Sequence, residues 1–425
     1  MNATFADRPR QDEDGAAHLP PRVGWRFIIA YALAHVGMWT ALLSPLLVGL
    51  ALRLREIDAA HAAADLSLVV GVGALLATLS NPLFGYLSDR TVSRFGMRRP
   101  WLIAGALGGA CGLAVIALAT SVVMVLVGWC IAQVAYNAML AVLSAMLSDQ
   151  VPMQQRGTVS GVLGVCTPVG MVGGTFMMQA TTASPLAMFM LPAATAIGGA
   201  LLLAGVLRDR MLAPAQRPPA YRFVEFFGRF WIAPLQNRDF AWVWVSRFLL
   251  FISIATLLSY QPFYLIEQLG RRSEEVPHLI FVSTLVQSAA VLVFSIGSGR
   301  LSDALGERRR FVFAAAITYA VAMIVTACAR DYRGFLVGVA LAGVAQAIYV
   351  AVGFALATDV LPDRSSAAAK DLGVFNMASA LPQSLAPAIA AAILALGGGY
   401  PLLFVVAAVF ALFAALAIRP VRAAR

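Results

Sequence analysis

The chain has 425 residues, of which 60% are hydrophobic and 12% charged, and its formal net charge is +10. Soluble domains contain about 25% charged residues, so the composition excludes a soluble globular protein with a fully solvated exterior. The four cysteines lie inside apolar runs without metal-ligand spacing, which excludes a disulfide framework and favours packing roles.

Apolar runs of about 20 residues, each long enough to cross a hydrocarbon layer about 30 Å thick, recur along the whole chain. They predict an all-α integral membrane protein with twelve transmembrane helices, arranged as two pseudo-repeats of six. The first six spans lie near 26–52, 66–88, 101–121, 123–147, 157–182 and 185–207. The second six lie near 241–266, 278–299, 311–329, 334–357, 372–397 and 400–418.

The segments outside the spans define the domain boundaries and the orientation. We expect an N-terminal tail over 1–25, a six-helix bundle over 26–207, a linker over 208–238, a second bundle over 239–418 and a C-terminal tail over 419–425. Of the 31 Lys and Arg residues, 24 lie on the side of the termini, six on the other side and one within a span. The positive-inside rule therefore places both termini in the cytoplasm of a plasma (inner) membrane protein. The net charge of +10 is then explained by the membrane topology and by attraction to anionic lipid, so no nucleic-acid partner is expected.

Span 1 contains an embedded ionisable side chain. His35 lies nine residues beyond Arg26, about 13 Å deep at ~1.5 Å per residue. Because histidine titrates near neutrality, His35 is a candidate for carrying a coupling proton. A neutral histidine that is hydrogen-bonded between helices is the simpler alternative. All 21 acidic residues lie in tails, loops or span ends, so no carboxylate is expected in the middle of the bilayer.

A dense group of charges separates spans 2 and 3. The stretch GYLSDRTVSRFGMRRPW, residues 85–101, contains Asp89 and four arginines. Gly85 leaves room for close helix approach, and Asp89 is placed where it could cap the N-terminus of a neighbouring helix. A plainer alternative is that the arginines only determine topology.

This stretch resembles the loop 2–3 signature of the major facilitator superfamily, Gly-x-x-x-Asp-Arg followed by a basic cluster. Its longer form is most similar to the glycoside–pentoside–hexuronide transporters and the plant sucrose symporters. The Asp-x-x-Pro-x-x-x-Arg-Gly run from Asp149 to Gly157 and the twelve spans fit the superfamily over the whole chain. The resemblance implies a secondary transporter that works by alternating access, with a sugar or glycoside as the leading substrate class. The resembled symporters usually have embedded carboxylates, so their absence here leaves the coupling ion open between a proton and another cation.

The resemblance also implies that the charges form a gate. Asp89 would cap span 11, near Asp371, and a charge cluster around Asp89 and Arg90 would hold the halves together only while the cytoplasmic side is closed. Asp89 and Asp149 have counterparts in the second half, 214 and 210 positions later. The full set of predicted gating residues is Gly85, Asp89, Arg90, Arg94, Arg98, Arg99, Asp149, Arg156, Asp303 and Asp359.

Polar and aromatic residues of spans 1, 4, 7 and 10 predict the lining of a substrate cavity near the midplane between the halves. Gln133 and Asn137 are the strongest pair, because they lie one turn apart on one face of span 4. Arg247 either snorkels to the interface or faces the cavity. Amides and aromatic rings suit a sugar and would also suit a planar drug, and helix–helix contact is the plainer role for each residue. The candidates are Tyr31, Trp39, Gln133, Asn137, Arg247, Tyr260, Gln261, Gln346 and Tyr349.

Two features favour no single interpretation. Span 5 reads GVLGVCTPVGMVGG and partly resembles the glycine–proline signature of antiporters, although Thr167 replaces the glycine before Pro168. Because of this partial resemblance, a drug or metabolite efflux antiporter is the alternative to a symporter. In the linker, YRFVEFFGRFW places Arg222, Glu225 and Arg229 on one helical face, which is typical of an interfacial helix; a plain connector is the alternative.

No enzymatic chemistry is expected. The sequence has no phosphate-binding Gly-rich Lys motif, no nucleophile–base pair and no metal-ligand cluster, so we expect no cofactor and no metal. The expected partners are a small-molecule substrate, a coupling ion and membrane lipid, with the chain as a monomer. A receptor or scaffold that transports nothing is the alternative from another functional class.

Overall fold

The computed structural model describes residues 22–209, 211, 237–359 and 368–421, and within these residues all regular secondary structure is helical. Among the described residues, twelve helical segments are long and apolar enough to cross a membrane, as predicted. The predicted interfacial helix of the linker lies outside the described residues. The first half contains α1 (Trp25–Ser44), η1 (Pro45–Gly49), α2 (Leu50–Ile57), α3 (Ala62–Asp89), α4 (Arg99–Ala117), α5 (Val122–Gln150), α6 (Met153–Ala180) and α7 (Pro185–Val206). The second half contains α10 (Arg238–Phe263), η3 (Tyr264–Gln268), α11 (Val276–Leu305), α12 (Arg308–Ala327), α13 (Tyr332–Asp359), α14 (Ala368–Ala395) and α15 (Tyr400–Ile418).

The first span of each half is interrupted next to a proline. The π-helical turn η1 begins at Pro45, and η3 begins two residues after Pro262. Proline lacks an N–H group and its ring clashes with the carbonyl four residues earlier, and a single π-helical turn absorbs such a disruption. The backbone N–H of Leu50 accordingly bonds to the carbonyl of Pro45, and that of Leu269 bonds to Tyr264. The two halves therefore share a local distortion as well as a fold.

The pairing of helices in one half recurs in the other. In the first half α1 packs on α6 and α7, α5 packs on α3 and α4, and α4 packs on α7. In the second half α10 packs on α14 and α15, α13 packs on α11 and α12, and α12 packs on α15. Each helix thus occupies the place of its counterpart six spans earlier, which confirms the predicted pseudo-repeats.

Small residues bring helices of one half into close contact. A Cβ atom on Gly199 of α7 would lie 2.7 Å from the carbonyl oxygen of Leu33 on α1, and one on Gly112 of α4 would lie 2.5 Å from the backbone nitrogen of Ala132 on α5. In lipid, no hydrophobic force drives helices together. Van der Waals packing does so instead, and such close approach of the backbones supplies it.

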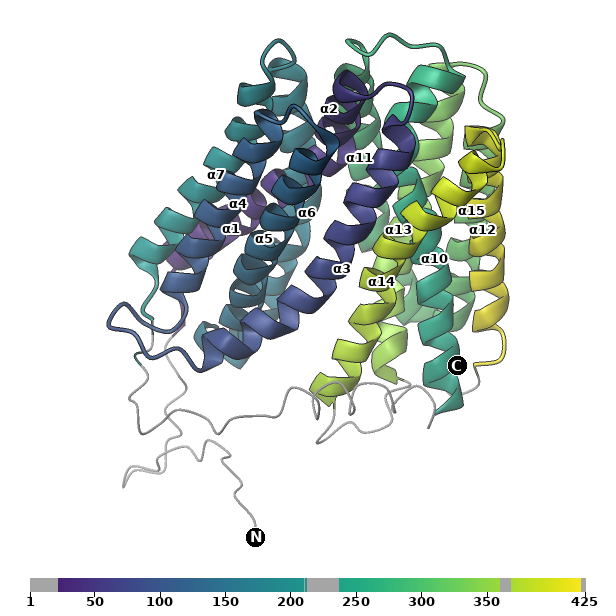
Figure 1. Cartoon of the computed structure of the whole chain (residues 1–425). Helices are drawn as coiled ribbons and strands as arrows, with labels where there is room; N and C mark the ends of the chain where they lie inside the picture. The colour runs from purple at the N-terminus through teal and green to yellow at the C-terminus, as the bar shows by residue number, and fades with distance from the viewer. Residues whose placement is uncertain (1–21, 210, 212–236, 360–367, 422–425) are drawn as a thin grey trace, which may run out of the picture.

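Four helices lie between the halves. α3 contacts α14, and α6 contacts α11. These are also the least buried of the twelve spans, with 28% to 39% of their apolar windows buried against 44% to 61% for the others. Figure 1 shows the two bundles side by side, with α3 and α14 crossing between them and their lower ends diverging. We call the end of the bundle where α1 begins and α15 ends the terminal end, and the other the distal end.

Candidate functional site

Arg98, immediately before α4, is the centre of a charged cluster at the terminal end. Its side chain is buried, with 3% exposure for the residue. Its Nη2 lies 2.6 Å from Oδ1 of Asp89 and 2.7 Å from Oδ2 of Asp149, and its Nε donates to the same Asp149 oxygen at 2.9 Å. Nη1 donates to Oγ of Ser88. The planar guanidinium can serve both carboxylates at once, so it ties together the ends of α3, α4 and α5.

Asp209, just beyond α7, completes this cluster and was not among the residues singled out from the sequence. Its Oδ2 accepts hydrogen bonds from the backbone N–H groups of Arg98 and Arg99, both at 2.8 Å. A carboxylate here satisfies free amides at the N-terminus of α4 and meets the positive end of the helix dipole. Gly96, whose φ of +97° favours glycine, passes so close that a Cβ atom would overlap the carboxylate. The only sequence signal for this capping role of Asp209 was that an acidic residue directly follows span 6.

The other arginines of the predicted gate have separate partners. Arg99 Nη2 donates to the carbonyl of Leu207. Arg156 donates to the carbonyls of Ser148 and Val151, at 2.9 and 3.0 Å, and so caps the end of α5. The guanidinium carbon of Arg90 lies 5.3 Å from the centre of the Tyr86 ring, and that of Arg94 lies 4.8 Å from the centre of the Phe95 ring.

The gate predicted around Asp89 and Arg90 thus has a different arrangement in this structure. Asp89 pairs with Arg98, within its own half. Nothing lies within 4 Å of a Cβ atom built on Gly85, so the predicted close helix approach there is not made in this conformation. Asp303 lies in the last turn of α11 and Asp359 is the last residue of α13; their side chains, and that of Asp371, lie outside the described residues.

Polar contacts join the two halves at the distal end. Oγ of Ser67, near the start of α3, lies 2.5 Å from the Tyr260 hydroxyl near the end of α10. Nη1 of Arg55 lies 3.0 Å from Oε1 of Glu267. Tyr260, a predicted substrate residue, is fully buried and forms part of this inter-half contact.

Apolar and backbone contacts reinforce this junction. The rings of Phe176 on α6 and Phe281 on α11 are 5.6 Å apart between centroids. Gly71 of α3 approaches the carbonyl of Ser384 on α14, with 3.6 Å between a built Cβ atom and that oxygen. The distal end is therefore closed by contacts from four pairs of helical elements: α3 with α10, α2 with η3, α6 with α11, and α3 with α14.

In the middle of the first half, the predicted residues contact their own helix or a neighbouring helix of the same half. Asn137 Nδ2 donates to the backbone carbonyl of Gln133 at 2.8 Å and to its Oε1 at 3.1 Å, and both residues are 7% exposed. The Tyr31 hydroxyl donates to the carbonyl of Leu143, which fixes Tyr31 as a contact between α1 and α5. Trp39 is partly buried and packs against Gly170 of α6.

His35 is held by its own helix. Its Nδ1 lies 3.0 Å from the carbonyl oxygen of Tyr31. A carbonyl only accepts hydrogen bonds, so Nδ1 carries the proton and Nε2 is the ring atom left to bind a second proton. The ring packs edge-on against Tyr31, with 4.7 Å between centroids, and the residue is 7% exposed.

In the second half, Arg247 is held between α10 and α14. Its Nε donates to Oγ of Ser379 at 2.6 Å, and its guanidinium carbon lies 4.8 and 4.3 Å from the ring centres of Phe251 and Phe375. Cation–π contact with two rings stabilises the charge away from water, so Arg247 does not snorkel free to the interface. Among the described residues, no carboxylate forms an ion pair with it. Tyr349 packs edge-on against Phe251 at 6.3 Å.

The two predicted amides of the second half, Gln261 and Gln346, complete this set. Gln287 Nε2 on α11 donates to Oε1 of Gln346 on α13 at 3.1 Å. Gln261 on α10 is 4% exposed. The predicted substrate residues lie on the first and fourth spans of each half, and Gln287 is a partner that the sequence patterns did not single out.

Comparisons with known proteins agree with this architecture. The model of the Major Facilitator Superfamily matches residues 27–286 and 273–425. Similar solved structures include a variant of the nucleoside transporter NupG (TM-score 0.73, 13% identity, 93% of this chain and 98% of that chain). Another is the human organic anion transporter MFSD10 (TM-score 0.65, 18% identity, 93% and 99% covered). A third is a bacterial homologue of the human lysosomal transporter Spinster, inward-facing and unoccupied (TM-score 0.65, 14% identity, 93% and 97% covered). At these identities the likeness describes the fold.

Proposed function

Because the chain belongs to the major facilitator superfamily and is a multi-pass membrane transporter, we propose that it moves a small organic solute by alternating access. The observation that carries this proposal is the distribution of contacts between the halves. They meet through Arg55–Glu267, Ser67–Tyr260 and Phe176–Phe281 at the distal end. The helices between the halves are the least buried spans.

The conformation is then an inward-open one, with the terminal end and both termini in the cytoplasm of a plasma (inner) membrane. In the opposite conformation the distal contacts separate and the terminal ends of α3 and α14 approach each other, where Gly85 has no side chain in the way. The Arg98 cluster gives α3, α4 and α5 a common rigid end for this movement. The contact energies on the two sides set the balance between conformations.

The substrate class that we favour is a sugar or glycoside. Gln133 and Asn137 form a preoriented pair of amides on α5, and Gln261, Gln346 and Tyr349 supply further polar groups from α10 and α13. Amides bond hydroxyl groups, and aromatic faces cover the apolar side of a ring. A nucleoside, which NupG transports, is one such glycoside.

An organic anion is the second candidate, and Arg247 favours it. The side chain places a positive charge between α10 and α14, with aromatic rings and a serine hydroxyl as its described partners. A carboxylate or phosphate on the solute would supply the missing counter-charge.

A counterflow experiment in proteoliposomes separates these possibilities. Vesicles loaded with one member of a panel of sugars, nucleosides or organic anions should accumulate only a matching labelled solute. Asn137→Ala should weaken uptake of a sugar or glycoside by about tenfold, whereas Gln150→Ala, at the end of the same helix, should not. Arg247→Gln should abolish uptake of an anion and spare a neutral solute. Absence of counterflow for every solute would contradict transport.

A further inference from the structure

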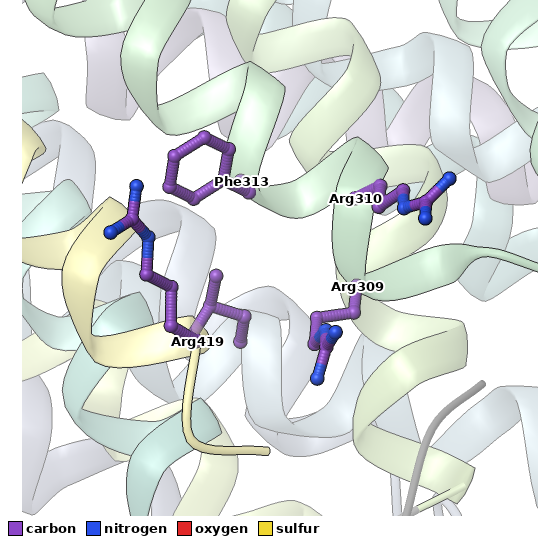
Figure 2. A pocket seen from close by; sticks show the side chains of 5 residues that line it. Arg309, Arg310, Phe313 and Arg419 are labelled. Carbon is purple, nitrogen blue, oxygen red and sulfur yellow. The ribbon is translucent and has the colours of Figure 1, made fainter. Parts of the chain in front are cut away.

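A cavity lies at the terminal end of the second half. Its volume is about 370 Å³, and it lies between the start of α12 and the end of α15. Arg309, Arg310, Phe313, Ile418 and Arg419 line it, and Figure 2 shows the guanidinium groups of Arg309, Arg310 and Arg419 on different sides of the hollow. None of these residues belongs to the substrate or gating sets.

The charges around this cavity are unbalanced. Arg310 pairs with Glu307 at 2.6 Å. Arg309 Nη1 donates to the carbonyl of Val421 at 2.8 Å, and Arg419 lies over the Phe313 ring at 4.9 Å. Among the described residues, three arginines thus share one paired carboxylate. Guanidinium groups held by carbonyl and ring contacts keep donors for an anion, and phosphate is the group that they bind best.

The terminal end of the first half has an equivalent region, between the start of α4 and the end of α7. There Arg99 donates to the carbonyl of Leu207, as Arg309 does to that of Val421, so the two regions share this contact. In the first half the carboxylate of Asp209 caps the N-terminus of α4. The position 214 residues after Asp209 is Ala423, which carries no charge, and Glu307 makes no side-chain cap at α12. Among the described residues, no carboxylate therefore caps the positive end of α12 as Asp209 caps that of α4.

Apolar stripes lead from this cavity toward the middle of the membrane. On α15, Leu416 and Leu412 lie three and seven residues before Arg419, on the same helical face, and are 48% and 44% exposed. On α12, Ile317 and Val321 follow Phe313 at spacings of four, and Val321 is 49% exposed. A cationic cavity at the membrane edge thus continues into two exposed apolar stripes.

We propose that this cavity binds the phosphate-bearing headgroup of an anionic glycerophospholipid, with its acyl chains along the stripes of α12 and α15. The arginines and the uncapped start of α12 meet the headgroup charge, and the stripes cover apolar chains that a free phosphate does not have. The site is independent of the transported solute.

The test uses the full chain, purified in a zwitterionic detergent, and native mass spectrometry with added phosphatidylglycerol or phosphatidylcholine. Phosphatidylglycerol should bind preferentially. Each of Arg310→Gln and Arg419→Gln should weaken it about fivefold, the value expected for one basic residue near an anionic headgroup. The matched controls Arg330→Gln and Arg333→Gln, at the distal end, should leave binding unchanged. All four variants should retain the parent melting temperature.

Three results would overturn the proposal. Equal weakening in the controls would indicate general surface attraction. Equal binding of phosphatidylcholine would remove the role of net headgroup charge. Displacement of phosphatidylglycerol by inorganic phosphate alone would identify a site for a free anion rather than for a lipid.

Discussion

Arg98 shows how a single residue can organise a loop. Asp89 and Arg90 are adjacent in sequence, but adjacent residues of a helix point in different directions. The partner of Asp89 is instead nine residues further along the chain, and Asp149 joins it from another helix. The residue types of this cluster were predictable from the sequence. Which arginine pairs with which carboxylate depended on how the ends of α3, α4 and α5 are placed in space.

Removal of Arg98 should destabilise the protein. Arg98→Ala leaves two carboxylates close together without their cation. Because Asp89 and Asp149 are 56% and 35% exposed, the loss should be about 1–3 kcal/mol, below that of a fully buried pair. Thermal unfolding in detergent measures it. Arg94→Ala, which removes an exposed arginine from the same loop, should change stability by no more than about 0.5 kcal/mol. Equal effects would mean that the Arg98 pairs are not formed.

His35 offers a test of coupling at the residue scale. If its Nε2 carries the coupling proton, His35→Gln should abolish accumulation driven by a proton gradient. Counterflow needs no net proton movement and should continue. Uptake assays with and without a gradient, in the same vesicles, measure both quantities. Unchanged gradient-driven accumulation would assign His35 a purely structural role.

At the scale of elements, the hydropathy of the sequence predicted all twelve spans, because a run of about 20 apolar residues is a strong signal. The exact ends of the helices and the interruptions within them depended on packing. Span 1 extends from Trp25 to Ile57 as an α-helix, a π-helical turn and a second α-helix, well beyond the predicted end at residue 52. The extra residues include the charged Arg53, Arg55 and Glu56, and at the distal end Arg55 contacts the other half.

Close helix packing can be tested with two adjacent glycines of α7. Gly199→Ala would place a Cβ atom 2.7 Å from the carbonyl oxygen of Leu33, so it should lower stability by about 1–3 kcal/mol as α1 and α7 move apart. Gly198→Ala meets nothing within 4 Å and should leave stability unchanged or slightly raised. Melting temperatures of the two variants, compared in one detergent, measure this. A greater loss for Gly198→Ala would reverse the assignment of the packed face.

At the scale of the whole molecule, function depends on how two similar halves contact each other. The Arg55–Glu267 pair is one of several distal contacts, and its partly exposed charges contribute about 1 kcal/mol or less. One such contact can shift the balance between conformations without dominating it.

Loss of this contact should shift the population of conformations. Spin labels at Val92 and Leu305, on opposite halves at the terminal end, should report a wide and a narrow distance in a chain whose four cysteines are replaced by serine. Glu267→Gln should raise the narrow population up to about fivefold. Glu275→Gln removes a carboxylate that pairs with Arg272 in the same half, so it should change nothing. A single distance in all variants, with and without solute, would contradict alternating access.

The membrane character, the twelve spans and the six-plus-six repeat follow from the sequence alone, because hydropathy and recurring polar landmarks are local properties that need no knowledge of packing. The tertiary structure decided which charges meet. It paired Asp89 with Arg98, placed Asp209 at α4 across more than 100 residues, and brought Tyr260, a predicted substrate residue, into contact with Ser67 of the other half. These outcomes depend on where helix ends converge in space, and the spacing of residues along the chain does not encode that convergence.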